Sequence, residues 1–361
     1  MASARAVKAR STIFPAALTH PTAPEDSRFA TPGKETAGVA IAGDAGSGTP
    51  RLETRETHHV QSLPREPAPK PARNPPHHPC ESPEAESVAN EVDRPIFIVA
   101  PHRSGTTLLY EIMSHHPELG YLDLGNCRWP RCPRLAWTLT RLGLPRKPRE
   151  AQVVWDRFWT TDDDCMGPEH ATPEAIAWHR RLTATVLRLR GVPRFVAKYP
   201  RFSLRMGWLN AVFPDALFVH ILRDWRAVVN STLVRRSKRM HRSRKWYGMH
   251  IPGWRQMGDV PWPLVAGRQY RVTTQAIEQQ GALLGSRFLS VRYGRLCAEP
   301  VATLRRIIDH CGLSWTSGFE QAVPRDLKSA NYKWREKLDP ADVERIRAED
   351  PAFYAAHEEA D

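Results

Sequence analysis

Residues 95–109, which read Pro95-Ile-Phe-Ile-Val-Ala-Pro-His-Arg-Ser-Gly-Thr-Thr-Leu-Leu109, predict a strand, a tight loop and a helix in succession. Residues 96–100 form a short apolar run that is typical of a buried strand. Pro101 and Gly105 interrupt this run, and apolar residues at helical spacing follow from Thr106. The first backbone N–H groups of a helix have no partner within it, and the helix dipole favours an anion there. The stretch therefore predicts a cradle for a phosphate or a sulfate.

The loop itself supplies further groups that bind an anion. Arg103 carries a fixed positive charge, and the hydroxyl groups of Ser104, Thr106 and Thr107 can donate hydrogen bonds. A nucleotide triphosphatase loop would instead read G-x-x-x-x-G-K-[ST], with its lysine on the outer phosphates. Ala100 stands in place of the first glycine of that pattern, and Thr106 stands in place of the lysine. The alternative is an ordinary strand–loop–helix turn that binds nothing.

The first part of this 361-residue chain differs in composition from the rest. Residues 1–94 hold 13 of the 32 prolines and none of the 12 tryptophans. They also carry 11 Lys and Arg against 12 Asp and Glu, so the formal net charge of +13 belongs to the remainder of the chain. A segment so rich in Pro, Ala, Ser, Thr and Gly buries too little apolar surface to offset its chain entropy. We expect residues 1–93 to be disordered and residues 94–361 to form one domain.

Several features together favour a cytoplasmic location. No stretch approaches the ~18 consecutive apolar residues of a membrane span, and the six cysteines are scattered without the spacing of a zinc site. We expect these cysteines to be reduced, and we expect no membrane span and no metal. Residues 1–20 are basic and weakly apolar, so a disordered tail is favoured, while organelle targeting stays open.

Three more short apolar runs predict strands, and they alternate with helices. The predicted strands are residues 194–200, 216–222 and 288–293. The predicted helices include residues 134–143, 174–190, 203–212, 268–279 and 300–312. Strands and helices in this order form a parallel sheet that is covered on both faces. The sequence therefore predicts an α/β fold with a P-loop-like parallel sheet, helices on both faces, and a disordered segment before it.

Cations and a hydroxyl group follow the predicted strands at suggestive positions. Lys198 ends the second strand, Arg223 follows the third, and Ser231 lies about two helical turns beyond Arg223. An arginine fork suits a phosphate dianion, and a lysine at a strand end can neutralise charge on a leaving oxygen. Ligands of such sheets bind at the carboxyl ends of the strands. One crevice at that edge can therefore hold the loop, the lysine and the arginine.

These motifs resemble those of sulfotransferases that use 3′-phosphoadenosine 5′-phosphosulfate. The segment P-x-R-S-G-T-T-L-L resembles their 5′-phosphosulfate loop, and Lys198-Tyr-Pro200 resembles their K-x-P segment. The spacing from Arg223 to Ser231 is similar to that of their 3′-phosphate site. Residues 291–296 match the family's V-x-Y-E-D-L at three positions, although Gly294 and Arg295 replace its two acids. The resemblance covers about residues 95–338.

The resemblance implies transfer of a sulfuryl group from this donor to an acceptor hydroxyl or amine, with no metal. It implies that the donor is bound by Arg103, Ser104, Gly105, Thr106, Thr107, Arg223, Ser231 and Tyr293. It also makes Arg103 and Lys198 catalytic, with Lys198 stabilising the leaving oxygen. Asp123 is the candidate base, because Phe202 occupies the place where some relatives carry a histidine.

The expected acceptor is a small molecule or a glycan. Residues 235–245 carry seven Lys and Arg, and tryptophans follow them, a composition that by itself could also bind nucleic acid. The resemblance implies that this stretch lies near the acceptor mouth, where it would favour an anionic or aromatic acceptor, and nucleic acid is not the partner we expect. Two alternatives stay open. One is a P-loop kinase that uses ATP and Mg²⁺, for which the loop lacks the usual lysine. The other is a protein that binds a nucleotide or a polyanion without catalysis.

Overall fold

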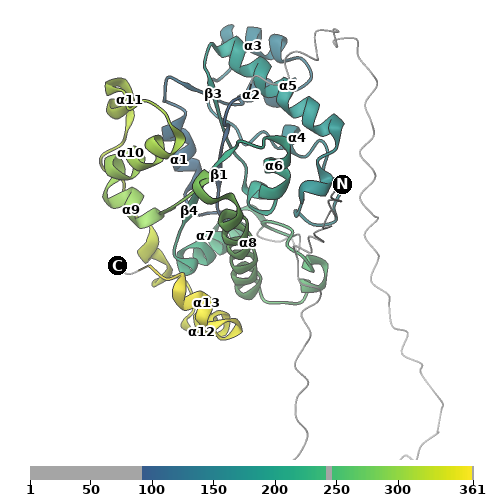
Figure 1. Cartoon of the computed structure of the whole chain (residues 1–361). Coiled ribbons are helices and arrows are strands. Elements are labelled where there is room, and N and C mark those ends of the chain that lie inside the picture. The colour runs from purple at the N-terminus through teal and green to yellow at the C-terminus, as the bar shows by residue number, and fades with distance from the viewer. Residues whose placement is uncertain (1–91, 241–245, 360–361) are drawn as a thin grey trace, which may run out of the picture. The chain divides into compact units, whose positions relative to one another are not determined.

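A five-stranded parallel sheet forms the middle layer of the computed structural model, which describes residues 92–240 and 246–359 (Figure 1). The strands are β1 (Ile96–Val99), β2 (Leu119–Gly120), β3 (Arg194–Lys198), β4 (Leu217–Leu222) and β5 (Phe288–Arg292). Their order is β2-β3-β1-β4-β5, and every neighbouring pair is parallel. β1 is therefore central, and the strands that follow it lie on both of its sides. Such a reversal of strand order is where open parallel sheets bind ligands.

Alternate residues of β1 point into two different cores, which explains its unbroken apolar sequence. Ile96 and Ile98 lie in one core, and Phe97 and Val99 lie in the other. All four are almost completely buried. The ring of Phe97 meets that of Phe202 edge-on, with the centroids 5.3 Å apart.

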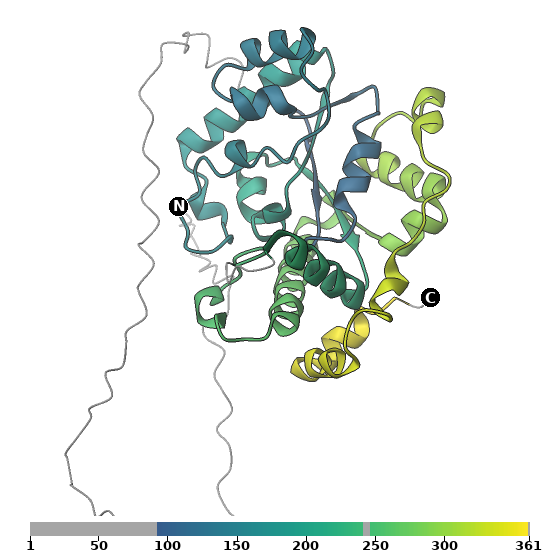
Figure 2. The ribbon, with the colours of Figure 1, turned by 180° about the vertical axis from the view of Figure 1, so that it is seen from behind.

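Helices cover both faces of the sheet (Figures 1 and 2). One face is covered by α1 (Thr106–Met113), α9 (Tyr293–Ala298), α10 (Pro300–Cys311) and α11 (Ser317–Ala322). The other is covered by α4 (Gln152–Trp155), α5 (Pro173–Arg190), α6 (Met206–Val212) and part of α8 (Trp262–Leu284). α2 (Leu124–Arg128) and α3 (Pro133–Arg141) pack on each other, and α3 contacts α5. The predicted parallel sheet with helices on both faces is confirmed.

A third core joins the two C-terminal helices to two long helices in the middle of the chain. It is formed by α7 (Trp225–Met240), α8, α12 (Pro340–Glu349) and α13 (Pro351–Ala356). Short 3₁₀ turns occupy Pro168–His170, Pro200–Leu204, Trp254–Met257, Gly285–Arg287 and Asn331–Trp334. None of the helices within residues 92–240 and 246–359 has the length and apolar character needed to cross a membrane.

Several boundaries differ from the sequence-based expectation. β2 has only two residues and was not expected as a strand, whereas α8 extends beyond the predicted 268–279 at both ends. The predicted helix over 203–212 begins as a 3₁₀ turn that ends at Leu204, and α6 starts at Met206. The segment expected to be disordered, residues 1–93, lies outside the described residues except for its last two. Residues 241–245 of the basic stretch also lie outside them.

Candidate active site

The loop after β1 is anchored at its start by a single hydroxyl group. Ser203 Oγ accepts a hydrogen bond from the backbone N–H of Ala100 (3.0 Å) and donates one to the carbonyl oxygen of the same residue (2.8 Å). Ser203 belongs to the 3₁₀ turn that follows β3. The start of the loop after β1 is therefore fixed to the turn that follows β3.

Two residues of the loop have the left-handed backbone conformation. Arg103 has φ 71°, which is unusual for a residue with a side chain, and Gly105 has φ 96°. A Cβ at Gly105 would lie 2.6 Å from Cδ2 of Tyr293, so only glycine fits between the loop and that ring. Gly105 is the N-cap of α1, and the first turn of this helix holds no acidic residue. This end of α1 therefore has no negative side chain of its own.

The hydroxyl groups predicted to bind the donor lie at this same turn. Ser104 is fully buried, and its Oγ has no hydrogen-bond partner among the described residues. Thr106 is buried and Thr107 is exposed in the first turn of α1. Since buried polar groups are normally satisfied, the Ser104 hydroxyl is a group that a bound anion could engage.

Arg223, directly after β4, holds this loop from the side. Its Nη1 donates to the carbonyl oxygen of Arg103 (2.9 Å), and its Nε donates to Oδ1 of Asn331 (2.8 Å). Its guanidinium carbon lies 4.3 Å from the ring centroid of Tyr293. Burial lowers the pKa of Arg223, but an arginine keeps its charge in proteins. The side chain is thus a buried cation with a fixed orientation.

α7 contributes two hydroxyl groups to the same cluster. Arg103 Nε donates to Ser231 Oγ (3.1 Å), and Thr232 Oγ1 lies 3.1 Å from Nε2 of His102. Arg103, Arg223, Ser231 and Tyr293 therefore lie together, although they come from four separate segments of the chain. The contact between Arg103 and Ser231 joins two residues that the sequence singled out, whereas Thr232 and His102 were not predicted.

Lys198 lies in β3, on the other side of β1 from Arg223, which follows β4. It ends β3, pairs in register with Ile98, and its side chain is only 4% exposed. Its ammonium group forms an ion pair with the carboxylate of Glu150, whose side chain is 48% exposed. The sequence did not identify Glu150, because it lies in a charged loop between predicted helices and 48 residues away from its partner.

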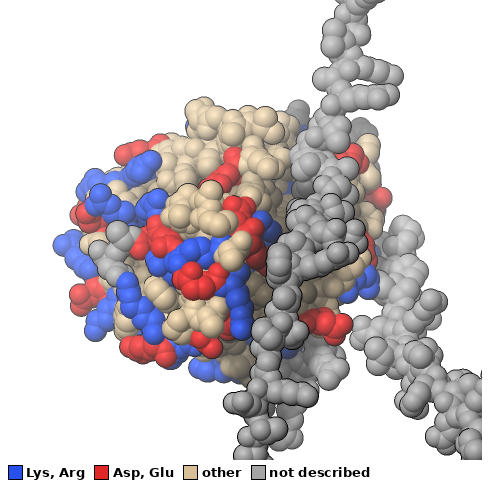
Figure 3. All heavy atoms as spheres, turned by 90° about the horizontal axis from the view of Figure 1, so that it is seen from below, with Lys and Arg blue, Asp and Glu red and all other residues tan. Residues whose placement is uncertain are grey.

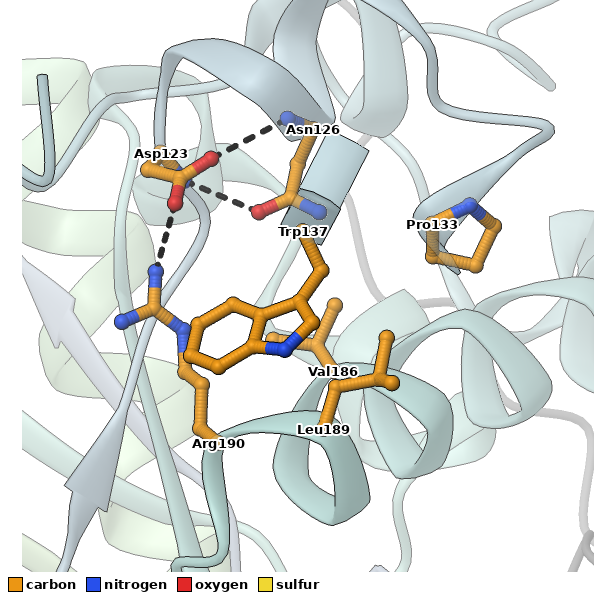
Figure 4. A pocket seen from close by; sticks show the side chains of 7 residues that line it. All are labelled: Asp123, Asn126, Pro133, Trp137, Val186, Leu189 and Arg190. Carbon is orange, nitrogen blue, oxygen red and sulfur yellow. Dashed lines mark hydrogen bonds and ion pairs between the residues drawn. The ribbon is translucent and has the colours of Figure 1, made fainter. Parts of the chain in front are cut away.

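Asp123, the predicted base, is buried and serves as the N-cap of α2 (Figure 4). Its carboxylate accepts from the backbone N–H of Asn126 (3.2 Å), from Thr140 Oγ1 (3.3 Å) and from Arg190 Nη2 (2.8 Å). The cavity beside it has a volume of about 10 Å³, which is room for one water molecule at most. The side chain therefore has its hydrogen bonds made, and no acceptor fits next to it in this arrangement.

A buried ionic network supports the segment that follows β3. Asp164 is fully buried and lies 3.0 Å from Arg201 Nε, while Asp156 lies 2.7 Å from Arg205 Nη1 and 2.8 Å from Arg201 Nη1. Three successive acids, Asp162 to Asp164, are typical of a solvated loop, yet Asp164 is buried. The four-residue spacing of Arg201 and Arg205 is the signal that could have indicated the network.

A wider cavity opens near the loop that carries Glu150. Its volume is about 300 Å³, and it is lined by Arg128, Trp129, Pro130, Arg131, Cys132, Val153 and Arg157. Three of these seven residues are arginines and none is acidic. Across the described part of the chain, no group of three or more His, Cys, Asp or Glu side chains is arranged to hold a metal ion.

The chain is similar in sequence to known sulfotransferases. The chain is 27% identical over 270 residues to the omega-hydroxy-beta-dihydromenaquinone-9 sulfotransferase Stf3 of Mycobacterium tuberculosis, covering 64% of this chain and 66% of that protein. It is 23% identical over 248 residues to protein-tyrosine sulfotransferase A of Caenorhabditis elegans, covering 66% of this chain and 56% of that one. The solved structure of sulfotransferase STF1 from Mycobacterium tuberculosis covers 76% of this chain and 79% of its own, at 19% identity and a TM-score of 0.47. The model of the sulfotransferase family matches residues 95–317, and the chain belongs to this family.

Proposed function

We propose that this protein transfers a sulfuryl group from 3′-phosphoadenosine 5′-phosphosulfate to a hydroxyl or amine of a small-molecule or glycan acceptor. Membership of the sulfotransferase family supports the reaction class. The observation that carries the proposal is the hydrogen bond from Arg223 to the carbonyl oxygen of Arg103. It places a buried cation against an anion-binding loop, as a ligand with two separated phosphate groups requires.

The residues of the cluster fit the donor in chemical terms. The loop N–H groups, Arg103 and the unpartnered Ser104 hydroxyl would hold the 5′-phosphosulfate. Arg223 and Ser231 would hold the 3′-phosphate, and the Tyr293 ring would lie near the adenine. When bound, the donor supplies the sulfuryl group and leaves as 3′,5′-adenosine bisphosphate.

Lys198 would act on the leaving group in this proposal. Negative charge grows on the oxygen that leaves the sulfur, and a fixed cation in a buried position stabilises it strongly. The 4% exposure of the Lys198 side chain keeps water from screening that charge. Asp123 as base stays a prediction, because its carboxylate would first have to leave Arg190.

The kinase alternative has weaker support. Asp224, which follows β4 as a metal-binding acid would in a P-loop kinase, accepts from the backbone N–H groups of Arg226 (2.8 Å) and Glu359 (3.0 Å). Its carboxylate also forms an ion pair with the Arg226 guanidinium. The family match is to sulfotransferases, so the kinase is retained only as a control in the test below.

The cavity with three arginines supports an acceptor that carries negative charge or an aromatic ring, because Trp129 also lines it. Nucleic acid is not the partner we propose. On the face drawn in Figure 3, Lys and Arg side chains are interspersed with Asp and Glu and form no continuous basic surface among the described residues. We also propose a cytoplasmic location, which reduced thiols at Cys127, Cys165, Cys297 and Cys311 support.

The test of the proposed function is the binding of 3′,5′-adenosine bisphosphate by the full chain, followed by thermal unfolding. A ligand present at about 100 times its Kd stabilises the folded state by ~2.7 kcal/mol. We expect this stabilisation with the bisphosphate and not with ATP and Mg²⁺. We then expect the chain to release bisphosphate from the sulfated donor when phenol is offered as acceptor. Stabilisation by ATP and Mg²⁺ alone would make the kinase the better assignment.

A further inference from the structure

We propose that Glu150 is the catalytic base that removes the acceptor's proton during sulfuryl transfer. This inference rests on the proposed function and adds a residue that neither the sequence motifs nor the comparisons assign. Its structural basis is the ion pair between Glu150 and Lys198, the lysine at the end of β3. Lys198 would contact the leaving oxygen of the donor, and Glu150 contacts Lys198. The Glu150 carboxylate would therefore lie close to the sulfur atom that the acceptor attacks.

The backbone around Glu150 is held by contacts on both sides. Arg149 donates its N–H to the carbonyl oxygen of Leu122 (2.9 Å) and accepts a hydrogen bond from the hydroxyl of Tyr110 in α1 (3.4 Å). Burial raises the pKa of Tyr110, so its hydroxyl keeps the proton that it donates. Ala151 is buried and has φ 50°, the left-handed conformation, which turns the chain into α4. These contacts fix the backbone while the Glu150 side chain stays accessible.

Of the three carboxylates Asp123, Asp224 and Glu150, Glu150 is the one whose side chain is widely exposed to solvent. Asp123 is 2% exposed and bonded to Arg190, Thr140 and Asn126. Asp224 is equally buried, with its oxygens on Arg226 and Glu359. Glu150 is half exposed, and Lys198 is its one hydrogen-bonding partner in the described part of the chain. The remaining lone pairs of its carboxylate are free to face an acceptor.

The cavity lined by arginines adds an approach for that acceptor. Val153, on its wall, lies three residues after Glu150 and belongs to α4. An acceptor body held against Trp129 and the arginines would thus lie beside the loop of Glu150. In this proposal the acceptor is bulky, with its body at the cavity and its reacting hydroxyl at Lys198.

The ion pair between Glu150 and Lys198 also couples proton removal from the acceptor to the departure of the bridging oxygen. The acceptor oxygen forms a bond to sulfur, while the bond between sulfur and the bridging phosphate oxygen breaks and leaves its electron pair on that oxygen. The acceptor's proton passes to the Glu150 carboxylate. As charge grows on the bridging oxygen, it attracts the Lys198 ammonium. A carboxylate that loses its cationic partner holds a proton more strongly, so the base becomes stronger at the moment it is needed.

The experiment compares the wild type, Glu150→Gln, Glu150→Asp and Asp123→Asn by donor consumption with two acceptors. Phenol is protonated at neutral pH, whereas a large fraction of 4-nitrophenol is already ionised. We expect Glu150→Gln to lower kcat with phenol by about 100-fold or more, with a much smaller loss for 4-nitrophenol. Glu150→Asp should recover part of the phenol activity. Glu344→Gln, which removes an exposed ion-pairing carboxylate on α12, is the matched control and should keep wild-type rates.

Each of the other possible results contradicts either the role of Glu150 or the proposed function. Equal losses with both acceptors in Glu150→Gln would make the residue a structural partner of Lys198 and not a base. Wild-type rates in Glu150→Gln, together with a loss confined to phenol in Asp123→Asn, would return the role to Asp123. Bisphosphate binding is measured in parallel by thermal unfolding. A wild-type chain that binds bisphosphate but consumes no donor would overturn the proposed function, and the role of Glu150 with it.

Discussion

Arg223 and Arg103 are joined by a hydrogen bond of 2.9 Å, from the guanidinium of the first to the backbone carbonyl oxygen of the second. This contact ties the end of β4 to the loop after β1. It also fixes Arg103 where its backbone is left-handed, with φ 71°. The conformation of the loop therefore depends on Arg223, which also supplies a buried positive charge to the site.

Replacing Arg223 by alanine should weaken the binding of 3′,5′-adenosine bisphosphate by about 10- to 100-fold. A hydrogen bond to a charged group contributes roughly 1.5–3 kcal/mol, and each 1.4 kcal/mol is about tenfold in Kd. Arg223→Lys should recover little, because an ammonium lacks the planar fork. The measurement is calorimetric titration with the bisphosphate. Arg295→Ala, an exposed arginine two residues after Tyr293, is the control and should leave the Kd unchanged.

Gly105→Ala should destabilise the fold and weaken bisphosphate binding together. The new Cβ would lie 2.6 Å from the Tyr293 ring, and the left-handed backbone alone costs about 1–2 kcal/mol in a residue with a side chain. Gly143→Ala provides the comparison, since Gly143 also has a positive φ but has nothing within 4 Å of its Cβ position. Urea unfolding should show the larger loss for Gly105→Ala. Adding Tyr293→Ala should recover part of it in a double-mutant cycle, and full additivity would refute the steric contact.

Asp123→Asn should lower the free energy of unfolding by about 3 kcal/mol. Asparagine is also a good N-cap, so the substitution mainly removes the charge that pairs with Arg190, and breaking a buried pair costs roughly 3–5 kcal/mol. Urea unfolding measures this change. Unchanged stability would mean that the Asp123 contacts are not structural, and would favour the sequence-based hypothesis that Asp123 is the base.

His179→Phe should stabilise the protein and reduce its sensitivity to acid. His179 is buried, stacks on Trp155 with ring centroids 5.2 Å apart, and neither ring nitrogen has a partner among the described residues. Burial, with a smaller effect of Arg157, lowers its pKa to about 3. The unfolded chain therefore binds a proton below about pH 6.5 that the folded one does not, and stability falls as the pH drops from there.

The check on this prediction is the free energy of unfolding of wild type and His179→Phe between pH 7 and pH 4. The slope for one proton is about 1.4 kcal/mol per pH unit. We expect the variant's curve to be shallower by about that amount at the acidic end. His220, whose pKa burial lowers to about 4, keeps its share of the slope in both proteins. Parallel curves would show that His179 is protonated equally in the folded and unfolded states.

The longer strands and the loop after β1 could be predicted because their signals are local. β1 is an apolar run, and Gly105 marks the turn into α1. The strand, the loop and the start of the helix can therefore be predicted from residues 95–109 alone. The spacing from Arg223 to Ser231 is also local, since β4 leads directly into α7. The two-residue β2 could not be predicted, because two residues are too few to show a period.

Contacts between distant segments could not be predicted in the same way. Lys198 was expected at a strand end, but its pairing with Glu150 depends on how the loop before α4 crosses α1. The burial of Asp123 depends on α2, α3 and α5 packing around it, whereas its sequence neighbours suggest an exposed loop. No pattern of residues along the chain reports such tertiary contacts.

The central place of β1 divides the proposed site into two halves. On the side of β4 lie Arg223, Ser231 and Tyr293, and on the side of β3 lie Lys198 and Glu150. The donor nucleotide would be common to relatives with this reaction, whereas acceptors differ. Under the proposed function, acceptor preference could be changed through the loop before α4 while Lys198 is kept for the donor, which makes that loop the segment to graft when a new acceptor is wanted.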